Sequence, residues 1–269
     1  MAKQEERLDR LVEIFKGESG EYRRLETPSD AEGKRRLLRS LMNKRMPGDM
    51  PAEALEVQDE YLKGRAKEKG IVLMSDIPVT CVNAGSEISI WKGDITRLAA
   101  GAIVNAANSQ MQGCFVPMHT CIDNCIHTFA GVQLRNECGK KMQQLRERYG
   151  DGYEQPTAVP MLTDAYNLPA DKVIHIVGPI VHEDLTQELE EDLASCYRNT
   201  LDMCADNDIK SVAFCCISTG VFHFPNRRAA EIAVQTVTDW LLEHPGKMDK
   251  VIFNVFKEED RSIYEELLR

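Results

Sequence analysis

The residues best suited to chemistry lie in one short stretch of the chain, between Gly113 and Asn124. It contains Cys114, His119 and Cys121 with the spacing Cys-x4-His-x-Cys, so that a single loop could surround a metal ion. Thiolate and imidazole are typical zinc ligands, and three protein ligands leave one position of a tetrahedral zinc ion open. The alternative is that both cysteines are small buried apolar residues and the histidine is an ordinary loop donor.

Residues next to this cluster bear on its chemistry. Cys121 lies near the expected start of a helix, where the dipole stabilises a thiolate over a thiol. Cys125 follows one helical turn later and is a possible substitute ligand, although a core position is the simpler interpretation. His127, on the same helix, is interpreted as structural.

Two loops offer polar groups that suit a nucleoside. Asp94, in Gly93–Thr96, follows an expected strand and could accept a hydrogen bond from an exocyclic amine such as that of adenine; the alternative is a helix cap. Asn105 and Asn108 flank two alanines, which lets a ligand approach the backbone, and their amides suit ribose hydroxyls. The alternative for this segment is an Asx-type turn.

A third loop, residues 216–225, joins a buried strand to a helix. Ser218, Thr219 and Gly220 place backbone amides where a pyrophosphate could bind, near the dipole of the following helix. Phe222 is too apolar for a loop tip unless it packs on something such as a sugar. A single glycine makes the loop neither a Walker motif nor a Rossmann fingerprint.

The overall composition restricts the partners and the compartment. The 269 residues include 33 Lys and Arg against 43 Asp and Glu, a net charge of −10. This disfavours a nonspecific nucleic-acid binder, which needs a basic face. No apolar run approaches the roughly 20 residues that span a bilayer, and the charged N-terminus lacks the apolar core of a signal peptide. We therefore expect a cytoplasmic protein whose nine cysteines are ligands, core residues or reactive thiols and not disulfides.

The elements that must position these residues fall into two parts. Residues 1–70 show helical spacing of apolar residues, with Asp30 as a plausible N-cap, and are predicted to form a helical N-terminal extension. Packing against the main domain is the simpler role for it, and docking of a partner is the alternative.

Residues 71–269 alternate strands with helices, which favours a largely parallel or mixed sheet. Ligands of such sheets bind beyond the carboxyl ends of the strands. The expected strands are 88–91, 102–104, 158–162, 173–177, 212–216 and 251–255, and the expected helices are 121–146, 188–206, 227–243 and a last one around 263–268.

Each of the three loops is a weak signal by itself, but their combination is typical of one protein family. Gly-Asp-Ile-Thr at 93–96, Ile-Val-Asn-Ala-Ala-Asn at 103–108 and Ile-Ser-Thr-Gly-Val-Phe-x-Phe-Pro at 217–225 resemble, in this order, the macrodomain family of ADP-ribose binders. The resemblance runs from about residue 80 to the C-terminus. It implies a three-layer α/β/α sandwich with a mixed central sheet, preceded here by the helical extension, and ADP-ribose as the ligand.

The resemblance also assigns ligand-binding residues. Asp94 would bind the adenine amine and the Ile95 amide the adenine ring, while Asn108 would bind the distal ribose; Asn105 stays a ligand-binding candidate on its residue type alone. Phe256, after the last strand, could stack on adenine. The diphosphate would be held by the amides of Ser218, Thr219, Gly220, Val221 and Phe222.

One departure from the common pattern is informative. Hydrolytic macrodomains usually follow Asn-Ala-Ala-Asn with a glycine run, and here Gly-Cys-Phe-x-Pro-x-His-x-Cys replaces that run. The chain in this respect looks like the zinc-containing microbial macrodomains, which remove ADP-ribose from proteins. By this match Cys114, His119 and Cys121 hold one Zn²⁺ per chain, and Asp123 takes the place of the family's catalytic aspartate.

The resemblance therefore implies a zinc-dependent hydrolase that removes mono-ADP-ribose from modified protein, most plausibly from a carboxylate. Asn108 would position the ribose, and Asp123 would orient or activate the attacking water. Zinc would orient the sugar, polarise it or lower the pKa of a bound water towards about 7. The alternative is a non-catalytic ADP-ribose reader with a structural zinc. Neither interpretation involves nucleic acid or a membrane.

Overall fold

The structure of the protein is a computed structural model that describes residues 2–269. These residues form two compact units, each assembled from separate parts of the chain. The helical unit comprises the chain through Gly70 together with Gln112–Asp151 and Tyr166–Leu168, and the sheet unit comprises Ile71–Met111, Gly152–Ala165 and Pro169–Arg269. Because each unit combines separate parts of the chain, their bounds differ from the predicted segments 1–70 and 71–269. The predicted division into an N-terminal extension and a macrodomain stays a prediction.

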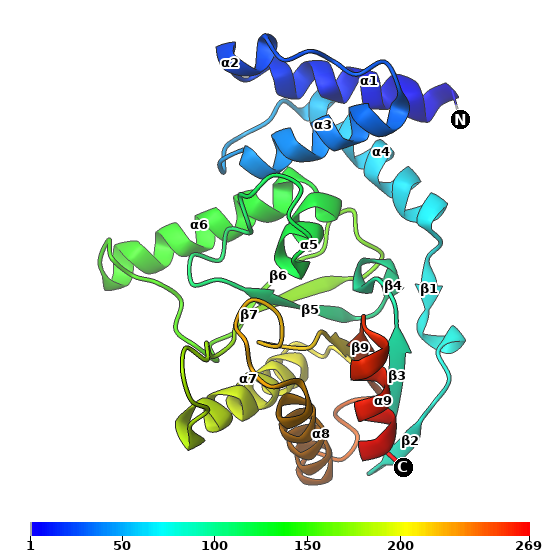
Figure 1. Cartoon of the computed structure of the whole chain (residues 1–269), viewed down its shortest axis with the longest axis vertical. Coiled ribbons are helices and arrows are strands. Elements are labelled where there is room, and N and C mark those ends of the chain that lie inside the picture. The colour runs from blue at the N-terminus through cyan, green and yellow to red at the C-terminus, as the bar shows by residue number, and fades with distance from the viewer. Residues whose placement is uncertain (1) are drawn as a thin grey trace. The chain divides into compact units, whose positions relative to one another are not determined.

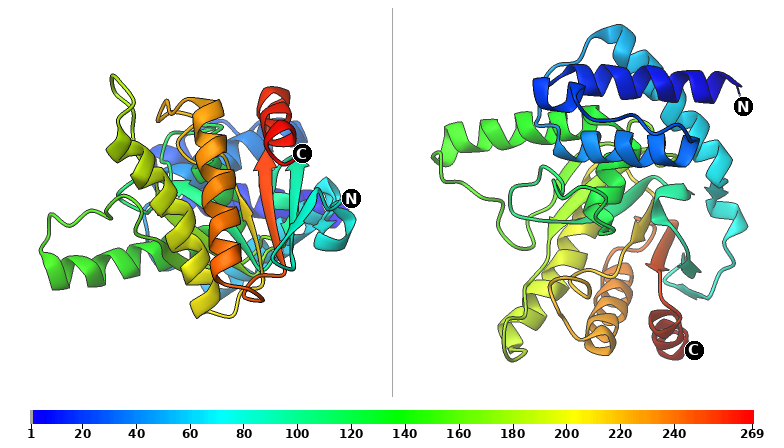
Figure 2. Two further views of the ribbon diagram at one scale, coloured as in Figure 1. Left: turned by 90° about the horizontal axis from the view of Figure 1, so that it is seen from below. Right: turned by 45° about the horizontal axis from the view of Figure 1, so that its top comes forward.

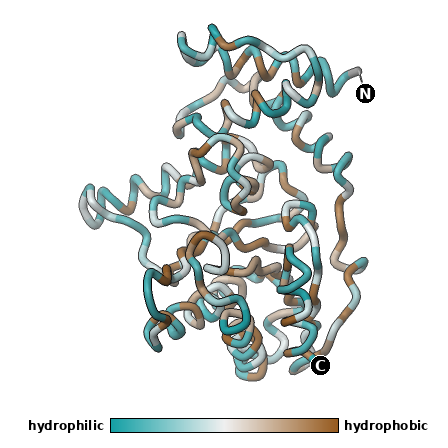
Figure 3. Tube along the Cα trace, viewed as in Figure 1, coloured by the Kyte–Doolittle hydropathy of each residue, from teal (hydrophilic) through white to brown (hydrophobic). Residues whose placement is uncertain are grey.

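The helical unit contains the expected N-terminal helices and two more (Figure 1). The carboxylate of Asp30 accepts a hydrogen bond from the Gly33 amide at 2.8 Å and caps the third helix, as predicted. Apolar residues at helical spacing, among them Leu8, Val12 and Leu38, form its buried core, and Figure 3 shows this alternation of hydrophobic and hydrophilic residues along the helices. The helices are α1 (Ala2–Gly17), α2 (Gly20–Arg23), α3 (Ala31–Lys44), α4 (Ala52–Lys69), α5 (Ile122–Ala130) and α6 (Val132–Tyr149).

The predicted continuous helix over 121–146 is wrong. The segment is broken between α5 and α6 at Gly131, which has a φ of +96°, a conformation that favours glycine. A Cβ at this position would come within 2.7 Å of Nε2 of Gln58 on α4. The break therefore lies at a glycine in the left-handed region, where the end of the Gln58 side chain approaches the backbone.

The sheet unit is built on a seven-stranded sheet with the order β2-β3-β9-β8-β5-β7-β6. The pairs β2–β3 and β6–β7 are antiparallel and the other pairs are parallel, so the sheet is mixed, as expected. The strands are β2 (Cys81–Asn83), β3 (Ser86–Lys92), β5 (Ala102–Ala107), β6 (Met161–Asp164), β7 (Lys172–Val177), β8 (Ser211–Phe214) and β9 (Lys250–Val255). A separate parallel pair joins β1 (Val72–Leu73) to β4 (Leu98–Ala99).

Three helices of the sheet unit, α7 (Gln187–Asp206), α8 (Asn226–Glu243) and α9 (Glu258–Leu267), lie side by side against the sheet (Figure 2). Their positions agree with the sequence predictions. Several strand ends differ. β5 continues to Ala107, three residues past the predicted end, because Asn105 to Ala107 pair with β7. β3 begins at Ser86, two residues before the predicted start, and β8 ends at Phe214, two residues before the predicted end. The predicted strand 158–162 is shifted to Met161–Asp164, since Ala158 has a φ of +61° and cannot continue a strand.

The parallel strands place the functional loops at one edge of the sheet. The carboxyl ends of β3, β5, β8 and β9 lead into Gly93–Thr96, Asn108, residues 216–225 and Phe256 respectively. Segments that are far apart in the chain thus meet at the edge where ligands of α/β sheets bind, as the sequence predicted.

Two further findings concern the described residues as a whole. Between residues 2 and 269, no helix has the length and apolar character needed to cross a membrane. All nine cysteines of the chain are free thiols.

A buried arginine ties the helical unit together. Arg135 on α6 is 5% exposed, and its Nη1 donates to the backbone oxygens of Met42, Asn43 and Arg45, at 3.0, 2.9 and 2.6 Å, at the end of α3. Its Nε donates to the oxygen of Gln112 at 2.8 Å. The last carbonyls of a helix have no partner within the helix, and the guanidinium supplies donors for them. Burial lowers the pKa of Arg135 to about 10, so the side chain stays charged at neutral pH.

We expect Arg135→Ala to lower the free energy of unfolding by about 3 kcal/mol, because hydrogen bonds from a charged group are lost and buried carbonyls are left without donors. Urea unfolding checks this. Lys140→Ala, at an exposed position of the same helix, is the control and should stay within about 0.5 kcal/mol of the unchanged protein. An unaltered urea midpoint for Arg135→Ala would contradict the assignment.

Candidate functional site

The loop after β3 has the geometry of a cap. Oδ1 of Asp94 accepts hydrogen bonds from the Thr96 amide at 3.0 Å and the Thr96 hydroxyl at 2.6 Å, at the start of the short 3-10 helix Ile95–Arg97. Asp94 is partly exposed, whereas Ile95 is 1% exposed. Asp94 therefore caps this short helix, which is the alternative considered for it. Its contact with an adenine amine stays a prediction.

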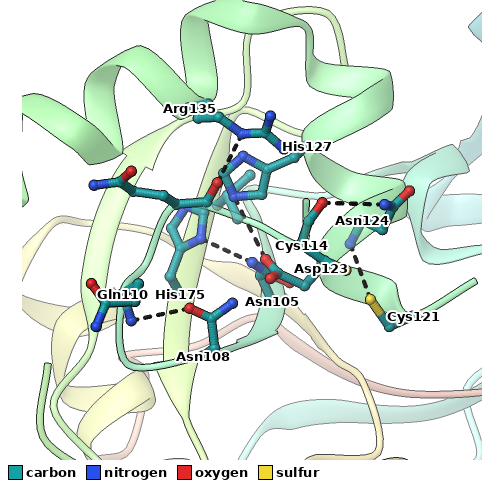
Figure 4. A network of polar contacts seen from close by, with 12 residues as sticks. Asn105, Asn108, Gln110, Cys114, Cys121, Asp123, Asn124, His127, Arg135 and His175 are labelled. Carbon is teal, nitrogen blue, oxygen red and sulfur yellow. Dashed lines mark hydrogen bonds and ion pairs between the residues drawn. The ribbon is translucent and has the colours of Figure 1, made fainter. Parts of the chain in front are cut away.

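The two asparagines of the second loop differ in their surroundings. Asn105 lies within β5, is fully buried, and its Nδ2 is 3.0 Å from Nδ1 of His175 on β7 (Figure 4). Nε2 of that histidine is 3.0 Å from the hydroxyl of Thr163 on β6. Asn105 thus links neighbouring strands inside the sheet unit, and its contact with a ligand stays a prediction.

Asn108 lies at the end of β5, where the strand turns. Its Oδ1 accepts a hydrogen bond from the Gln110 amide at 3.0 Å, which is the Asx-type turn considered for this segment. Glu154 holds the turn from outside, since it accepts hydrogen bonds from Ser109 at 2.6 Å and from Gln110 at 2.9 Å. The turn keeps Asn108 partly exposed at the sheet edge.

The third loop is tightly shaped at its start and open at its tip. Ser218 is 5% exposed with a φ of +63°, and its backbone oxygen accepts from the Phe224 amide at 3.0 Å. A Cβ on Gly178 would lie 2.2 Å from the Ser218 hydroxyl oxygen, so only glycine permits this approach. Gly220 and Val221 are exposed at the tip, which leaves the backbone there accessible to an anion.

Phe256 follows β9 at the same edge. It is 77% exposed, so its ring is open for a planar ligand to stack on. The loops and Phe256 that the sequence assigned to one ligand are therefore brought together in the sheet unit.

The predicted metal ligands lie in the helical unit, on the segment Cys114–Cys121, which we call the metal loop. The ligand atoms of Cys114, His119 and Cys121 all lie within 4.8 Å of one another. Sγ of Cys114 is 3.5 Å from Nδ1 of His119. In a tetrahedral zinc site a sulfur and a nitrogen ligand are about 3.6 Å apart, as follows from the usual bond lengths. The donor atoms therefore fit zinc in both type and spacing.

Asn124, in the first turn of α5, shapes the metal loop. It is fully buried, and its Nδ2 donates to the backbone oxygens of Cys114 at 3.2 Å and Val116 at 3.0 Å. Its backbone amide donates to Sγ of Cys121 at 3.4 Å, so the thiol caps α5 (Figure 4). One residue thus contacts both ends of the loop.

Asp123 is 4% exposed and lies one residue before Asn124. Its Oδ1 is 3.6 Å from Nε2 of His127, one turn later on the buried side of α5. Gly113 lies against this histidine, because a Cβ there would be 2.7 Å from the ring. The carboxylate occupies the first turn of a helix, where the dipole favours negative charge.

Sequence reasoning missed the residues that support the metal loop, namely Asn124, Arg39, Asn43 and Arg135. One signal was available for Arg135, because it shares a helix face with Cys138 and Met142, both buried. Cys125, considered as a substitute ligand, instead lies 3.5 Å from the Arg39 guanidinium. His223 is exposed, as expected.

Burial raises the pKa of the Cys121 thiol to about 12. A raised pKa means that the thiol keeps its proton at neutral pH, and a metal ion must displace that proton to bind. We therefore expect alkylation of Cys121 in metal-free protein to accelerate about tenfold per pH unit from pH 7 to pH 9 without levelling, because only the thiolate reacts.

Peptide mapping by mass spectrometry after iodoacetamide treatment measures this rate. The urea-unfolded protein is the control. There the alkylation rate of the same cysteine should begin to level near the ordinary thiol pKa of about 8.5. A rate in the folded protein that levels below pH 9 would contradict the burial of this thiol.

Comparison with known proteins identifies the family. The family model described as Macro domain matches residues 104–233. A protein named Protein-ADP-ribose hydrolase from Treponema medium is 46% identical over 265 residues, 98% of this chain and 99% of that protein. One of the same name from Staphylococcus aureus (strain MRSA252) is 40% identical over 97% of this chain and 94% of its own length.

Solved structures show the same fold. The Trypanosoma brucei macrodomain in complex with ADP-ribose has a TM-score of 0.66 at 27% identity and covers 86% of this chain and 95% of its own. The Oceanobacillus iheyensis macrodomain with ADP has a TM-score of 0.61 at 37% identity and covers 70% and 93%. These matches confirm the predicted three-layer α/β/α class with a mixed sheet. The chain belongs to the macrodomain family.

Proposed function

We propose that this chain is a protein-ADP-ribose hydrolase that removes mono-ADP-ribose from modified protein, with zinc as its cofactor. The observation that carries the proposal is the end-to-end likeness, at 46% identity, to a relative of that name. It extends over 98% of this chain, a range that includes the helical extension and the metal loop as well as the nucleotide loops. The acceptor we propose is a carboxylate, and the compartment is the cytoplasm.

The sheet unit supplies the binding half of this function. Phe256 offers an exposed ring for adenine, and Asp94 lies beside it in sheet order, since β3 and β9 are neighbours. The exposed backbone at Gly220 and Val221 suits a diphosphate, and the α8 dipole adds favourable potential. Asn108, with its turn held by Glu154, can present its amide to the distal ribose.

The helical unit supplies the chemical half. Asp123 is buried at a helix start, where a carboxylate can hold a water molecule in one orientation and accept its proton. The water oxygen bonds to the anomeric carbon of the distal ribose, and the bond from that carbon to the acceptor oxygen breaks. The acceptor leaves as a carboxylate, and the proton from water passes through Asp123 to solvent.

Cys114, His119 and Cys121 would hold the zinc ion. When bound, it supplies a Lewis acid with an open position that can fix the ribose and stabilise developing charge. Only five residues of the chain lie between Asn108 and Cys114, so the residue assigned to the ribose is close in sequence to the metal loop.

Release of ADP-ribose from a mono-ADP-ribosylated protein, with and without a zinc chelator, tests the proposal. We expect turnover that stops on metal removal and returns when zinc is added. Intact ADP-ribose binding with no turnover under any condition would instead support a reader with a structural zinc. Turnover that survives metal removal in a folded protein would refute the catalytic zinc.

Two substitutions separate binding from chemistry. We expect His119→Ala to abolish turnover while ADP-ribose still binds, since one metal ligand is lost and the nucleotide loops are untouched. Asp94→Ala should raise the Kd for ADP-ribose about tenfold, which corresponds to about 1.4 kcal/mol, and leave kcat nearly unchanged. Calorimetric titration and single-turnover release measure the two quantities. An unchanged turnover rate in His119→Ala would be decisive against this scheme.

Asp123→Asn keeps the size of the side chain and removes its ability to accept a proton. We expect kcat to fall by about 10²- to 10⁴-fold, the usual contribution of general base catalysis, with zinc content and ADP-ribose affinity retained. Rates at saturating substrate, together with zinc analysis, check this. A fall of less than about fivefold would show that Asp123 does not activate water.

A further inference from the structure

We propose that Arg39 and Asn43 of α3 are positioning residues for the metal site, so that the helical extension is a working part of that site. The proposal rests on the zinc site of the proposed function. It assigns a role to residues 1–70, where the sequence contains no recognisable catalytic or ligand-binding motif.

The metal loop needs support from outside itself. Residues 114–121 form neither helix nor strand, and Met118, next to His119, has a φ of +60°. A residue other than glycine adopts this left-handed conformation at a cost, and it persists where its surroundings hold it. The placement of His119 therefore depends on contacts that fix the backbone before it.

Asn43 makes such a contact. It is 1% exposed, and its Oδ1 accepts a hydrogen bond from the Met118 amide at 3.0 Å. Its Nδ2 donates to the hydroxyl of Thr128 on α5 at 2.9 Å. The side chain thus uses its acceptor on the metal loop and its donor on the helix that follows the loop, which fixes the orientation of its amide.

Arg39, one turn earlier on α3, holds the loop at a second point. Its Nη2 donates to the backbone oxygen of His119 at 2.7 Å and to Oδ1 of Asn124 at 2.9 Å. Because that oxygen faces the guanidinium, the amide nitrogen of Asn124 is directed to the carbonyls of Cys114 and Val116. Arg39 therefore acts on one proposed ligand directly and on another through Asn124.

The spacing of the two residues places both side chains on one face of α3, because positions i and i+4 share a helix face. Arg135 on α6 holds the end of that helix, since it donates to the carbonyls of Met42 and Asn43 and to that of Arg45 just beyond it. Partners that orient metal ligands typically change metal affinity by about 10- to 100-fold when they are removed. If α3 only packed against the metal loop, removal of these two side chains would not change the metal affinity.

Metal binding to the full-length protein tests the proposal without reference to turnover. The Kd for Zn²⁺ is measured by competition with a chelator, and Co²⁺ is bound separately, since its ligand-field and thiolate charge-transfer bands report the coordination geometry. The variants are Arg39→Ala and Asn43→Ala, with Arg36→Ala, exposed on the same helix, as the matched control. The unfolding midpoint of each metal-free variant and its ADP-ribose affinity are measured alongside.

We expect both variants to raise the Kd for Zn²⁺ by about tenfold or more and to alter the Co²⁺ spectrum, with ADP-ribose affinity within twofold of the unchanged protein. Arg36→Ala should match the unchanged protein, and Arg39→Lys, which keeps a donor for the His119 carbonyl, should recover part of the affinity. Unchanged Zn²⁺ affinity and Co²⁺ spectra in both alanine variants would overturn the proposal, as would an equal loss in Arg36→Ala.

If the alanine variants fail to fold, the milder variants Arg39→Lys and Arg39→Gln are compared with the unchanged protein. The Kd for Zn²⁺ should rise from the unchanged protein to Arg39→Lys and again to Arg39→Gln. An equal Kd in all three proteins overturns the proposal. A wild-type chain that binds neither metal would refute the zinc site itself. That result is distinct from normal metal binding with no effect at Arg39 and Asn43.

Discussion

The geometry of the metal loop depends on one buried amide, the side chain of Asn124. A loop of eight residues that presents three donor side chains to one point cannot be held by its own backbone, since it forms neither helix nor strand. Asn124 donates to its carbonyls at two positions and contacts the thiol of Cys121 through its backbone amide. The donor atoms converge because this amide is held in turn by the guanidinium of Arg39.

Buried polar groups are expensive unless they are fully paired. The helical unit buries Asn43, Asn124 and Arg135 almost completely, and each of them bonds to backbone or to a neighbouring side chain. Apolar residues in these places would have no hydrogen-bonding groups. They would not hold carbonyl groups at chosen positions, and a metal site requires its ligands to be held to within about half an ångström.

The residues proposed for binding and those proposed for chemistry are held by different kinds of structure in this chain. The nucleotide loops follow the ends of parallel strands, where loop length and a few glycines decide the shape of the backbone, as the approach of Gly178 to Ser218 shows. The metal loop and Asp123 are instead organised by helices.

The sequence by itself determined the family and the fold class, and it predicted a metal donor set and the loops of a nucleotide site. Each of these is written in a short contiguous motif, and a motif such as Cys-x4-His-x-Cys keeps its donors close whatever surrounds it. The break at Gly131 and the extension of β5 to Ala107 were missed. The extension arises from pairing with β7, and the break lies where the Gln58 side chain approaches the backbone, so both involve residues distant in the chain.

Only the tertiary structure decided what holds the metal loop. Arg39 and His119 are 80 residues apart, and Asn43 and Thr128 are 85 apart. Arg39 and Asn43 occur in a helix whose periodicity indicates nothing beyond packing. A hydrogen bond depends on distances of about 3 Å between donor and acceptor, and no local pattern specifies such a distance across that length of chain. The folding of α3 against the loop creates it.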